Sequence, residues 1–252
     1  MKHFKQAIIN ELEDYKILLR NVPTLVVVFF AISCIGMNLF AGKELLNIEY
    51  LALDCGFLLS WMSFLCMDML TKRFGAKAAI KISFLAIGFN LVWCGITFVV
   101  SNIRGNWSTY YTYESAIAND ALNDVFGGAW YVLLGSTIAM AISSIVNSVL
   151  NSAIGKVLKK NTFVAFATRS YVSTAVGQFV DNLLFALIVS VTFFGWTPIQ
   201  VIMCSITGAV AELIAEVIFS PIGYRVCKKW EDENIGNQYL EYRESLKSVN
   251  KA

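Results

Sequence analysis

The chain has 252 residues, of which 57% are hydrophobic and 15% charged, with a formal net charge of +2 and a mean hydropathy of +0.61. Soluble domains carry about 25% charged residues, so this composition excludes a soluble fold. The small net charge and the lack of a basic stripe exclude a nucleic-acid partner, and the chain is expected to be an integral membrane protein.

Six apolar stretches are each long enough to cross a bilayer as a helix, which takes about 20 residues. An amphipathic cytoplasmic segment, residues 1–21, precedes them, and a cytoplasmic tail, residues 222–252, follows them. In chain order the predicted spans are 22–40, 51–70, 79–100, 130–150, 166–194 and 199–219. None alternates as a barrel strand would. The predicted fold is an all-α membrane protein, with residues 22–221 forming a bundle of six transmembrane helices.

The distribution of Lys and Arg predicts the orientation of this bundle. Eighteen of the 20 basic residues fall in segments that six spans place on one side, and only Lys43 and Arg104 fall on the other. Cytoplasmic loops carry the excess of basic residues. Both termini are therefore expected in the cytoplasm, and the protein in the cytoplasmic (inner) membrane as a multi-pass protein.

Several chemical functions are disfavoured by residues that the chain lacks. Its six cysteines occur singly, and His3 is its one histidine, so a metal site is not predicted. The sequence has no Gly-rich phosphate loop and no nucleophile elbow. We therefore predict no catalytic residue, no cofactor and no enzymatic activity.

Polar side chains inside the predicted spans are the main candidates for a functional site, because such residues are costly in hydrocarbon. On the fifth span, helical spacing places four candidates on one face, namely Thr174, Gln178, Asp181 and Phe185. The other spans contribute Trp61, Asn90, Trp93, Asn147, Glu212 and Glu216. At 1.5 Å per residue, Asp181 falls at the bilayer midplane, with Gln178, Asn90 and Glu212 at similar depth. Transporter substrate sites usually lie at this depth.

Some of these residues also have a structural interpretation. We expect Asp68 to end the second span and to pair with Lys72, Arg73 or Lys81. The hydroxyl residues of the fourth and fifth spans suit close helix packing equally well, and tryptophans are common apolar filling. Asp181 differs, since Arg169 lies about 18 Å away along the same helix and cannot neutralise it.

The stretch RSYVSTAVGQFVDNLLFALIVSVTFFG, residues 169–195, resembles the characteristic motif of the queuosine-precursor transporters, once grouped as vitamin uptake transporters. The matching positions are Arg169, Ser173, Thr174, Gln178, Asp181 and Phe185. DMLTKRFG at 68–75 and EVIFSP at 216–221 resemble two further pieces of that family. Two positions depart from its pattern, since many members carry Lys at Glu212 and often Glu at Lys72.

The resemblance implies uptake of a 7-deazaguanine base: 7-cyano-7-deazaguanine, its aminomethyl form or queuine. The guanine-like edge of such a base offers two adjacent donors, which a carboxylate accepts in parallel. We therefore expect Asp181 or Glu212 to be the acceptor. Supporting hydrogen bonds are expected from Gln178, Asn90 and Asn147, and a stacking surface from Trp61, Trp93 or Phe185, with Thr174 and Arg169 completing the substrate site.

The sequence is least informative about the energy source to which transport is coupled. A proton carried by Asp181, Glu212 or Glu216 would drive uptake, and facilitated diffusion is the competing interpretation. The membrane subunit of an energy-coupling-factor vitamin transporter, a membrane-embedded enzyme and a purely structural membrane protein are the alternatives. The expected partners are a nucleobase and the lipid bilayer, with a homo-oligomer left open.

Overall fold

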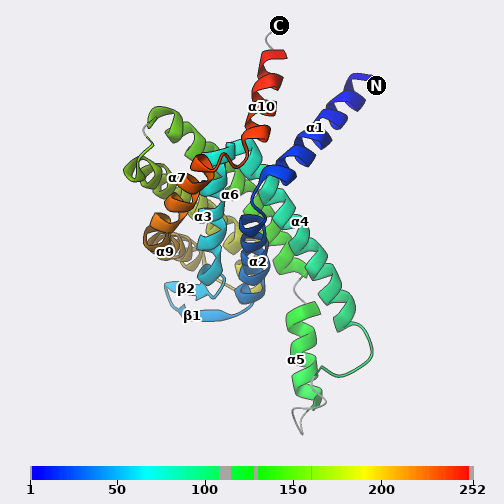
Figure 1. The fold of residues 1–252 in the computed structure, drawn as a ribbon. Coiled ribbons are helices and arrows are strands. Elements are labelled where there is room, and N and C mark those ends of the chain that lie inside the picture. The colour runs from blue at the N-terminus through cyan, green and yellow to red at the C-terminus, as the bar shows by residue number, and fades with distance from the viewer. Residues whose placement is uncertain (1, 108–114, 128–129, 160, 250–252) are drawn as a thin grey trace.

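The structure is a computed structural model that describes residues 2–107, 115–127, 130–159 and 161–249. It is a bundle of helices with one small hairpin (Figure 1). In chain order the elements are α1 (Lys2–Asn21), α2 (Thr24–Ala41), β1 (Glu44–Ile48), β2 (Leu51–Asp54), α3 (Phe57–Phe74), α4 (Ala76–Ser101), α5 (Ser115–Gly127), α6 (Trp130–Val157), α7 (Phe163–Phe185), the π-helical turn η1 (Ala186–Ser190), α8 (Val191–Phe194), α9 (Pro198–Asp232) and α10 (Asn237–Val249).

Helix α3 is the central element of the bundle, and it packs against α2, α4, α6, α7 and α9. Its apolar side chains Phe64 and Met67 are fully buried in the main hydrophobic core. Its polar side chains Ser63 and Asp68 are fully buried as well. Because buried polar groups need hydrogen-bond partners, this helix fixes where polar residues of its neighbours gather.

Five stretches of the described residues are long and apolar enough to cross a membrane: α2, α4, Ile117–Val157 with α6, Phe163–Phe194 with α7, and α9. Helix α3 is not among them, although a span was expected at 51–70, because the charged residues Asp68, Lys72 and Arg73 in its C-terminal half lower its hydropathy. Large apolar side chains such as Leu25 and Val92 are exposed, which suits contact with lipid. The protein is a multi-pass membrane protein.

Residues 51–54, expected to start the second transmembrane helix, form strand β2 instead. This strand pairs antiparallel with β1, with Ile48 opposite Leu51, and the helix begins only at Phe57. The reason is tertiary: Ala52 is buried against a cluster that includes Trp196, whose indole N–H donates a 2.7 Å hydrogen bond to Glu44 of β1. These contacts override a local apolar pattern that suits either helix or strand.

Helix α9 starts where the sequence predicts and ends later. Thr197 caps it, Pro198 opens it and Gln200 completes a capping box, which satisfies the backbone N–H groups of Thr197 and Gln200. The predicted span ended at residue 219, but the helix continues through Pro221 to Asp232. At 1.5 Å per residue it is about 50 Å long, which exceeds the about 30 Å hydrocarbon core, so one end projects beyond the core.

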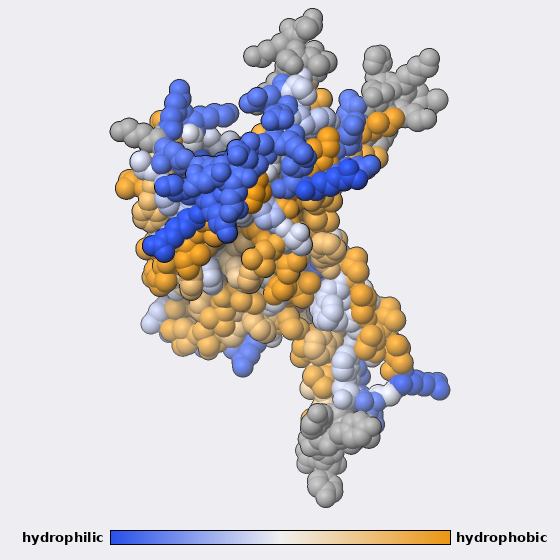
Figure 2. All heavy atoms as spheres, in the orientation of Figure 1, coloured by the Kyte–Doolittle hydropathy of each residue, from blue (hydrophilic) through white to orange (hydrophobic). Residues whose placement is uncertain are grey.

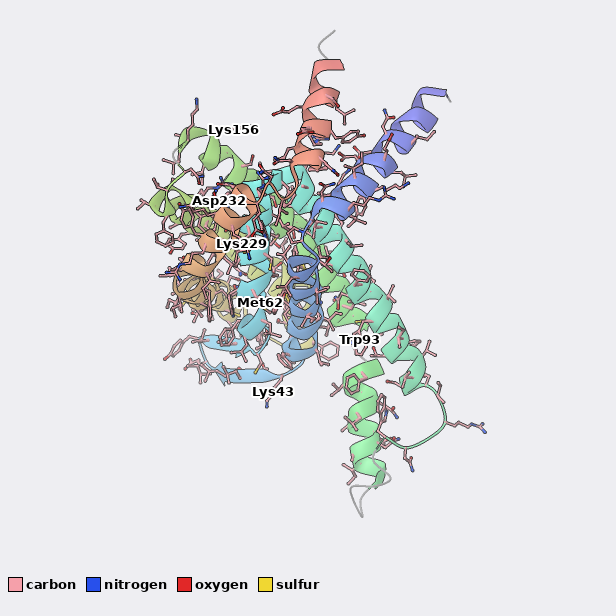
Figure 3. All side chains as sticks on the ribbon, viewed as in Figure 1. Lys43, Met62, Trp93, Lys156, Lys229 and Asp232 are labelled. Atoms are coloured by element: carbon pink, nitrogen blue, oxygen red, sulfur yellow. The ribbon has the colours of Figure 1, made fainter. Side chains whose placement is uncertain are left out.

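Both terminal helices project from one end of the bundle, which we call the terminal end, whereas β1 and β2 lie at the opposite end, the hairpin end (Figure 1). Asp14 of α1 joins the two terminal helices through a 3.5 Å contact with Arg243 of α10. Hydrophilic side chains gather at the terminal end, and apolar ones cover most of the rest of the visible face (Figure 2). Lys156 and Lys229 lie at the terminal end and Lys43 at the hairpin end (Figure 3).

Candidate functional site

A polar pocket of about 330 Å³ opens among α2, β2, α3, α6, α7 and α9, and we call it the hairpin-end pocket. Its polar lining residues are Asn38, Asp54, Ser60, Ser136, Asp181, Asn182 and Glu212, and Met37, Ala41, Phe57 and Phe185 supply apolar surface. The described lining contains three carboxylates and neither Lys nor Arg, so it favours a ligand rich in hydrogen-bond donors.

Asp181 is buried on the inner face of α7. The hydroxyl of Ser143 on α6 donates a 2.6 Å hydrogen bond to its Oδ1. Among the described residues this is the one hydrogen bond of the Asp181 side chain, so Oδ2 has acceptor capacity left for a ligand.

Glu212 of α9 is more fully engaged than Asp181. Ser60 of α3 donates to its Oε1, and Asn182 of α7 lies 3.4 Å from its Oε2. Gly208, one turn earlier on α9, allows this approach, because a Cβ there would lie 2.7 Å from Nδ2 of Asn182. Glu212 therefore holds neighbouring helices together and has less capacity for a ligand.

Asp54 lies on the hairpin, outside the helices, and is half-buried. The backbone N–H of Gly56 donates a 2.7 Å hydrogen bond to its Oδ1. Loss of solvent raises the pKa of Asp54 to about 7, because desolvation outweighs this hydrogen bond and the neighbouring Asp181 and Glu44 carboxylates act in the same direction. The charge of the pocket therefore changes near neutral pH.

A second group of polar residues, the Asp68–Glu216 cluster, lies nearer the terminal end and comprises Asp68, Asn147, Ser170, Ser173, Thr174 and Glu216. The expected pairing of Asp68 with Lys72, Arg73 or Lys81 is wrong. Asp68 is fully buried and accepts hydrogen bonds from Asn147 at 2.8 Å and Thr174 at 3.1 Å. Those three cations bond elsewhere, Lys72 to Glu231, Arg73 to Ile235 and Asn237, and Lys81 to Glu11 and Asp14. The sequence could not reveal this, because the partners of Asp68 come from distant helices.

The structure thus separates the sequence-predicted residues into two groups and several isolated positions. Asp181, Glu212 and Phe185 line the hairpin-end pocket, whereas Thr174, Asn147 and Glu216 belong to the Asp68–Glu216 cluster. Both groups include residues on the same inner face of α7.

The remaining candidates lie apart from both groups. Trp61 stacks on Phe219, with ring centroids 4.4 Å apart, and Trp93 lines a mainly apolar pocket beside α5. Asn90 is buried, and its Oδ1 has no partner among the described residues. Arg169 lies toward the terminal end, where its Nε donates to Asn151.

Gln178 is a buried amide that lies between the two groups. It lies between Thr174 and Asp181 on the inner face of α7, and its side chain is fully buried. Within the described residues neither its amide oxygen nor its amide nitrogen has a hydrogen-bond partner. A buried amide left unpaired costs about 1–3 kcal/mol, so the arrangement favours a bound polar ligand, water or a second conformation.

Four polar residues of the pocket were not anticipated from the sequence: Asn38, Asp54, Ser60 and Asn182. A local signal existed for two of them. Asn38 is an amide inside an apolar stretch, and Asn182 directly follows Asp181. Asp54 and Ser60 gave no such signal, because their roles depend on the hairpin and on contact with α9.

The family model described as "Putative vitamin uptake transporter" matches residues 54–226. The matched region contains the three carboxylates of the hairpin-end pocket and both carboxylates of the Asp68–Glu216 cluster. No curated protein and no solved structure matches the chain.

Proposed function

Because the chain belongs to the vitamin uptake transporter family, we propose that it carries a 7-deazaguanine precursor of queuosine into the cell. The candidates are 7-cyano-7-deazaguanine, its aminomethyl form and queuine. The observation that carries this proposal is the hairpin-end pocket, in which Asp181 presents an incompletely bonded carboxylate in a lining without Lys or Arg.

The chemistry of the pocket suits a guanine-like edge. The ring N–H and the exocyclic amine of such a base are adjacent donors, and a carboxylate accepts both in parallel. Asp181 is the proposed acceptor, while the amides of Asn38 and Asn182 are available to the carbonyl oxygen and ring nitrogen. The rings of Phe57 and Phe185 supply flat apolar surface for the heterocycle.

We also propose that α3 is the sixth transmembrane helix and that both termini lie in the cytoplasm. Contact between Asp14 and Arg243 supports an even number of spans, since it places α1 and α10 on the same side. The five apolar stretches together with α3 give that even number. The terminal end, where Lys156 and Lys229 lie (Figure 3), suits the cytoplasmic side of the inner membrane, because cytoplasmic segments carry the excess of basic residues.

Uptake by living cells tests the proposed substrate. Cells that cannot synthesise queuosine precursors and lack their own importer would receive either the gene or an empty vector. We expect saturable uptake of radiolabelled 7-cyano-7-deazaguanine only with the gene, competed by the unlabelled aminomethyl base. Equal uptake in both strains would contradict the proposed substrate.

Reconstitution tests the alternative of an energy-coupling-factor subunit. Proteoliposomes that contain this chain alone should exchange internal unlabelled base for external labelled base. A requirement for partner ATPases would instead identify the chain as a substrate-binding subunit. The proposed role includes no catalytic step, and the base should be recovered chemically unchanged.

A further inference from the structure

Two carboxylates outside the hairpin-end pocket meet at one hydroxyl group. Asp68 of α3 and Glu216 of α9 are both fully buried. The Oγ of Ser170 on α7 lies within hydrogen-bond distance of Oδ2 of Asp68 and of Oε1 of Glu216. A serine hydroxyl has one hydrogen, so it can donate to only one of these oxygens.

Counting hydrogens shows which contact lacks one. If both carboxylates were ionised, one of the two contacts to Ser170 would join oxygen lone pairs without any hydrogen between them. Asp68 also accepts from Asn147 and Thr174, which stabilises its charged form, whereas Oε2 of Glu216 has no partner among the described residues. One proton on Glu216 completes the set, because Glu216 then donates to Ser170 and Ser170 donates to Asp68.

Among the described residues, no cation pairs with the cluster and neutralises its negative charge in place of that proton. Arg169 on α7 directs its Nε to Asn151, and Lys72 on α3 pairs with Glu231 at 2.5 Å. On α9 the titratable neighbours are Glu212, one turn before Glu216, and Cys227, and neither is a cation. The facing residues of α6 are uncharged. None of the ion pairs in the described part of the chain includes Asp68 or Glu216. Two neighbouring carboxylates without a cation cannot both stay charged at low cost.

We propose that the Asp68–Glu216 cluster binds one proton, carried by Glu216, and that release and uptake of this proton drive transport through the separate hairpin-end pocket. The transport half of this inference rests on the proposed function. Substrate binding then belongs to Asp181 and proton carriage to Glu216, although the sequence made Asp181, Glu212 and Glu216 all candidates for the proton.

The fold provides polar connections on both sides of the cluster. Toward the hairpin end, Glu216 follows Glu212 by one turn of α9, and the unpaired amide of Gln178 lies between the two sites on α7. Toward the terminal end, Ser173 contacts Asp68 at 3.4 Å and Asn151 at 3.2 Å.

Asn151 in turn accepts from Arg169, which lines a polar pocket of about 460 Å³ together with Lys72. This polar pocket at the terminal end is the proposed destination of the proton. Glu216 lies one helical turn from Glu212 of the hairpin-end pocket, so a change in its charge acts on that pocket at short range.

Infrared spectroscopy of the purified protein tests the proton assignment without any substrate. A protonated carboxylic acid has a C=O stretch that a carboxylate lacks. We expect Glu216→Gln to remove one such band from the wild-type spectrum at neutral pH. Glu231→Gln, the same chemical change on the same helix beyond the cluster, should leave that band in place. A band unchanged by Glu216→Gln would overturn the assignment.

Proteoliposomes test the coupling. With an inward proton gradient, wild-type protein should accumulate the labelled 7-deazaguanine base above equilibrium, and a protonophore should abolish the accumulation. Glu216→Gln mimics the protonated acid, so it should retain exchange of labelled for unlabelled base but lose the accumulation. Glu231→Gln should retain both activities.

The outcomes separate the two proposals. Accumulation by Glu216→Gln equal to that of wild type would overturn the coupling while the substrate stands. Absence of both exchange and accumulation in wild type would instead refute the substrate, and the infrared result would still decide where the proton is bound. If Glu216→Gln did not fold, Ser170→Ala would replace it, since removal of the bridging hydroxyl should shift the pH profile of accumulation.

Discussion

The hydroxyl of Ser143 on α6 donates a 2.6 Å hydrogen bond to Oδ1 of Asp181 on α7. This single contact orients the carboxylate while leaving Oδ2 without a partner among the described residues. A binding group held by one neighbour and open to a ligand is pre-organised, because its rotamer is fixed before binding. The relationship accounts for the choice of Asp181 over the more fully bonded Glu212 as the substrate acceptor.

Replacement of this carboxylate is the most direct test of the pocket. Asp181→Asn should lower affinity for the 7-deazaguanine base by about 10- to 100-fold, since hydrogen bonds to charged groups contribute about 1.5–3 kcal/mol. The measurement is radioligand binding to purified protein, with membrane insertion checked separately. Asp124→Asn on α5 is the matched control, because it removes an exposed carboxylate outside the pocket. Normal binding by Asp181→Asn would show that the substrate lies elsewhere.

Close approach of α7 and α9 can be tested at a glycine. Gly208→Ala should place a methyl group 2.7 Å from Nδ2 of Asn182, which forces the amide away from Glu212. Overpacking of this kind costs about 1–3 kcal/mol, so we expect a lower Tm and a higher KM for uptake.

Gly88→Ala on α4 is the control, since a Cβ there meets nothing within 4 Å. It should leave uptake unchanged and should not lower the Tm, because alanine is the better helix former. Equal behaviour of the two variants would contradict the predicted contact.

The hairpin depends on its attachment to the segment before α9. Trp196→Phe keeps the aromatic packing but removes the 2.7 Å hydrogen bond to Glu44, at a cost of about 1 kcal/mol. Hydrogen exchange of the backbone amides in residues 44–54 should become faster. Trp130→Phe changes an exposed tryptophan of α6 and should leave that exchange as it is in wild type. Unchanged protection in Trp196→Phe would mean that the hydrogen bonds between β1 and β2 are stable without the contact between Trp196 and Glu44.

The pKa of Asp54 predicts a dependence of stability on pH. Its folded value of about 7 exceeds the ordinary 3.8, so between these values the folded state binds more protons than the unfolded state. The contribution of Asp54 to the unfolding free energy therefore falls as the pH rises from about 4 to about 7. Asp54→Asn should make the Tm of the purified protein less sensitive to pH in this interval. The same slope in both proteins would refute the role of Asp54.

Labelling of single introduced cysteines tests the topology. Lys43→Cys at the hairpin end should react with a membrane-impermeant maleimide added to intact cells. Lys156→Cys at the terminal end should react only after the membrane is permeabilised. The unmodified chain, with its six native cysteines, provides the background. Labelling of both variants from the outside would contradict the model with α3 as a span and cytoplasmic termini.

The sequence by itself determined that this is a helical membrane protein, because long apolar runs are stable as helices in lipid wherever the rest of the chain lies. It also identified the inner face of α7, since the helical period alone aligns Thr174, Gln178 and Asp181.

Only the tertiary structure decided how that face is used. Asp68 bonds to side chains of α6 and α7, and Asp181 accepts from Ser143 and lines the same pocket as Asp54. The hairpin forms because Trp196 and Gln200 bond to it. A hydrogen bond between residues that are distant in sequence depends on which helices become neighbours. That choice follows from packing of the entire bundle, which no local pattern contains.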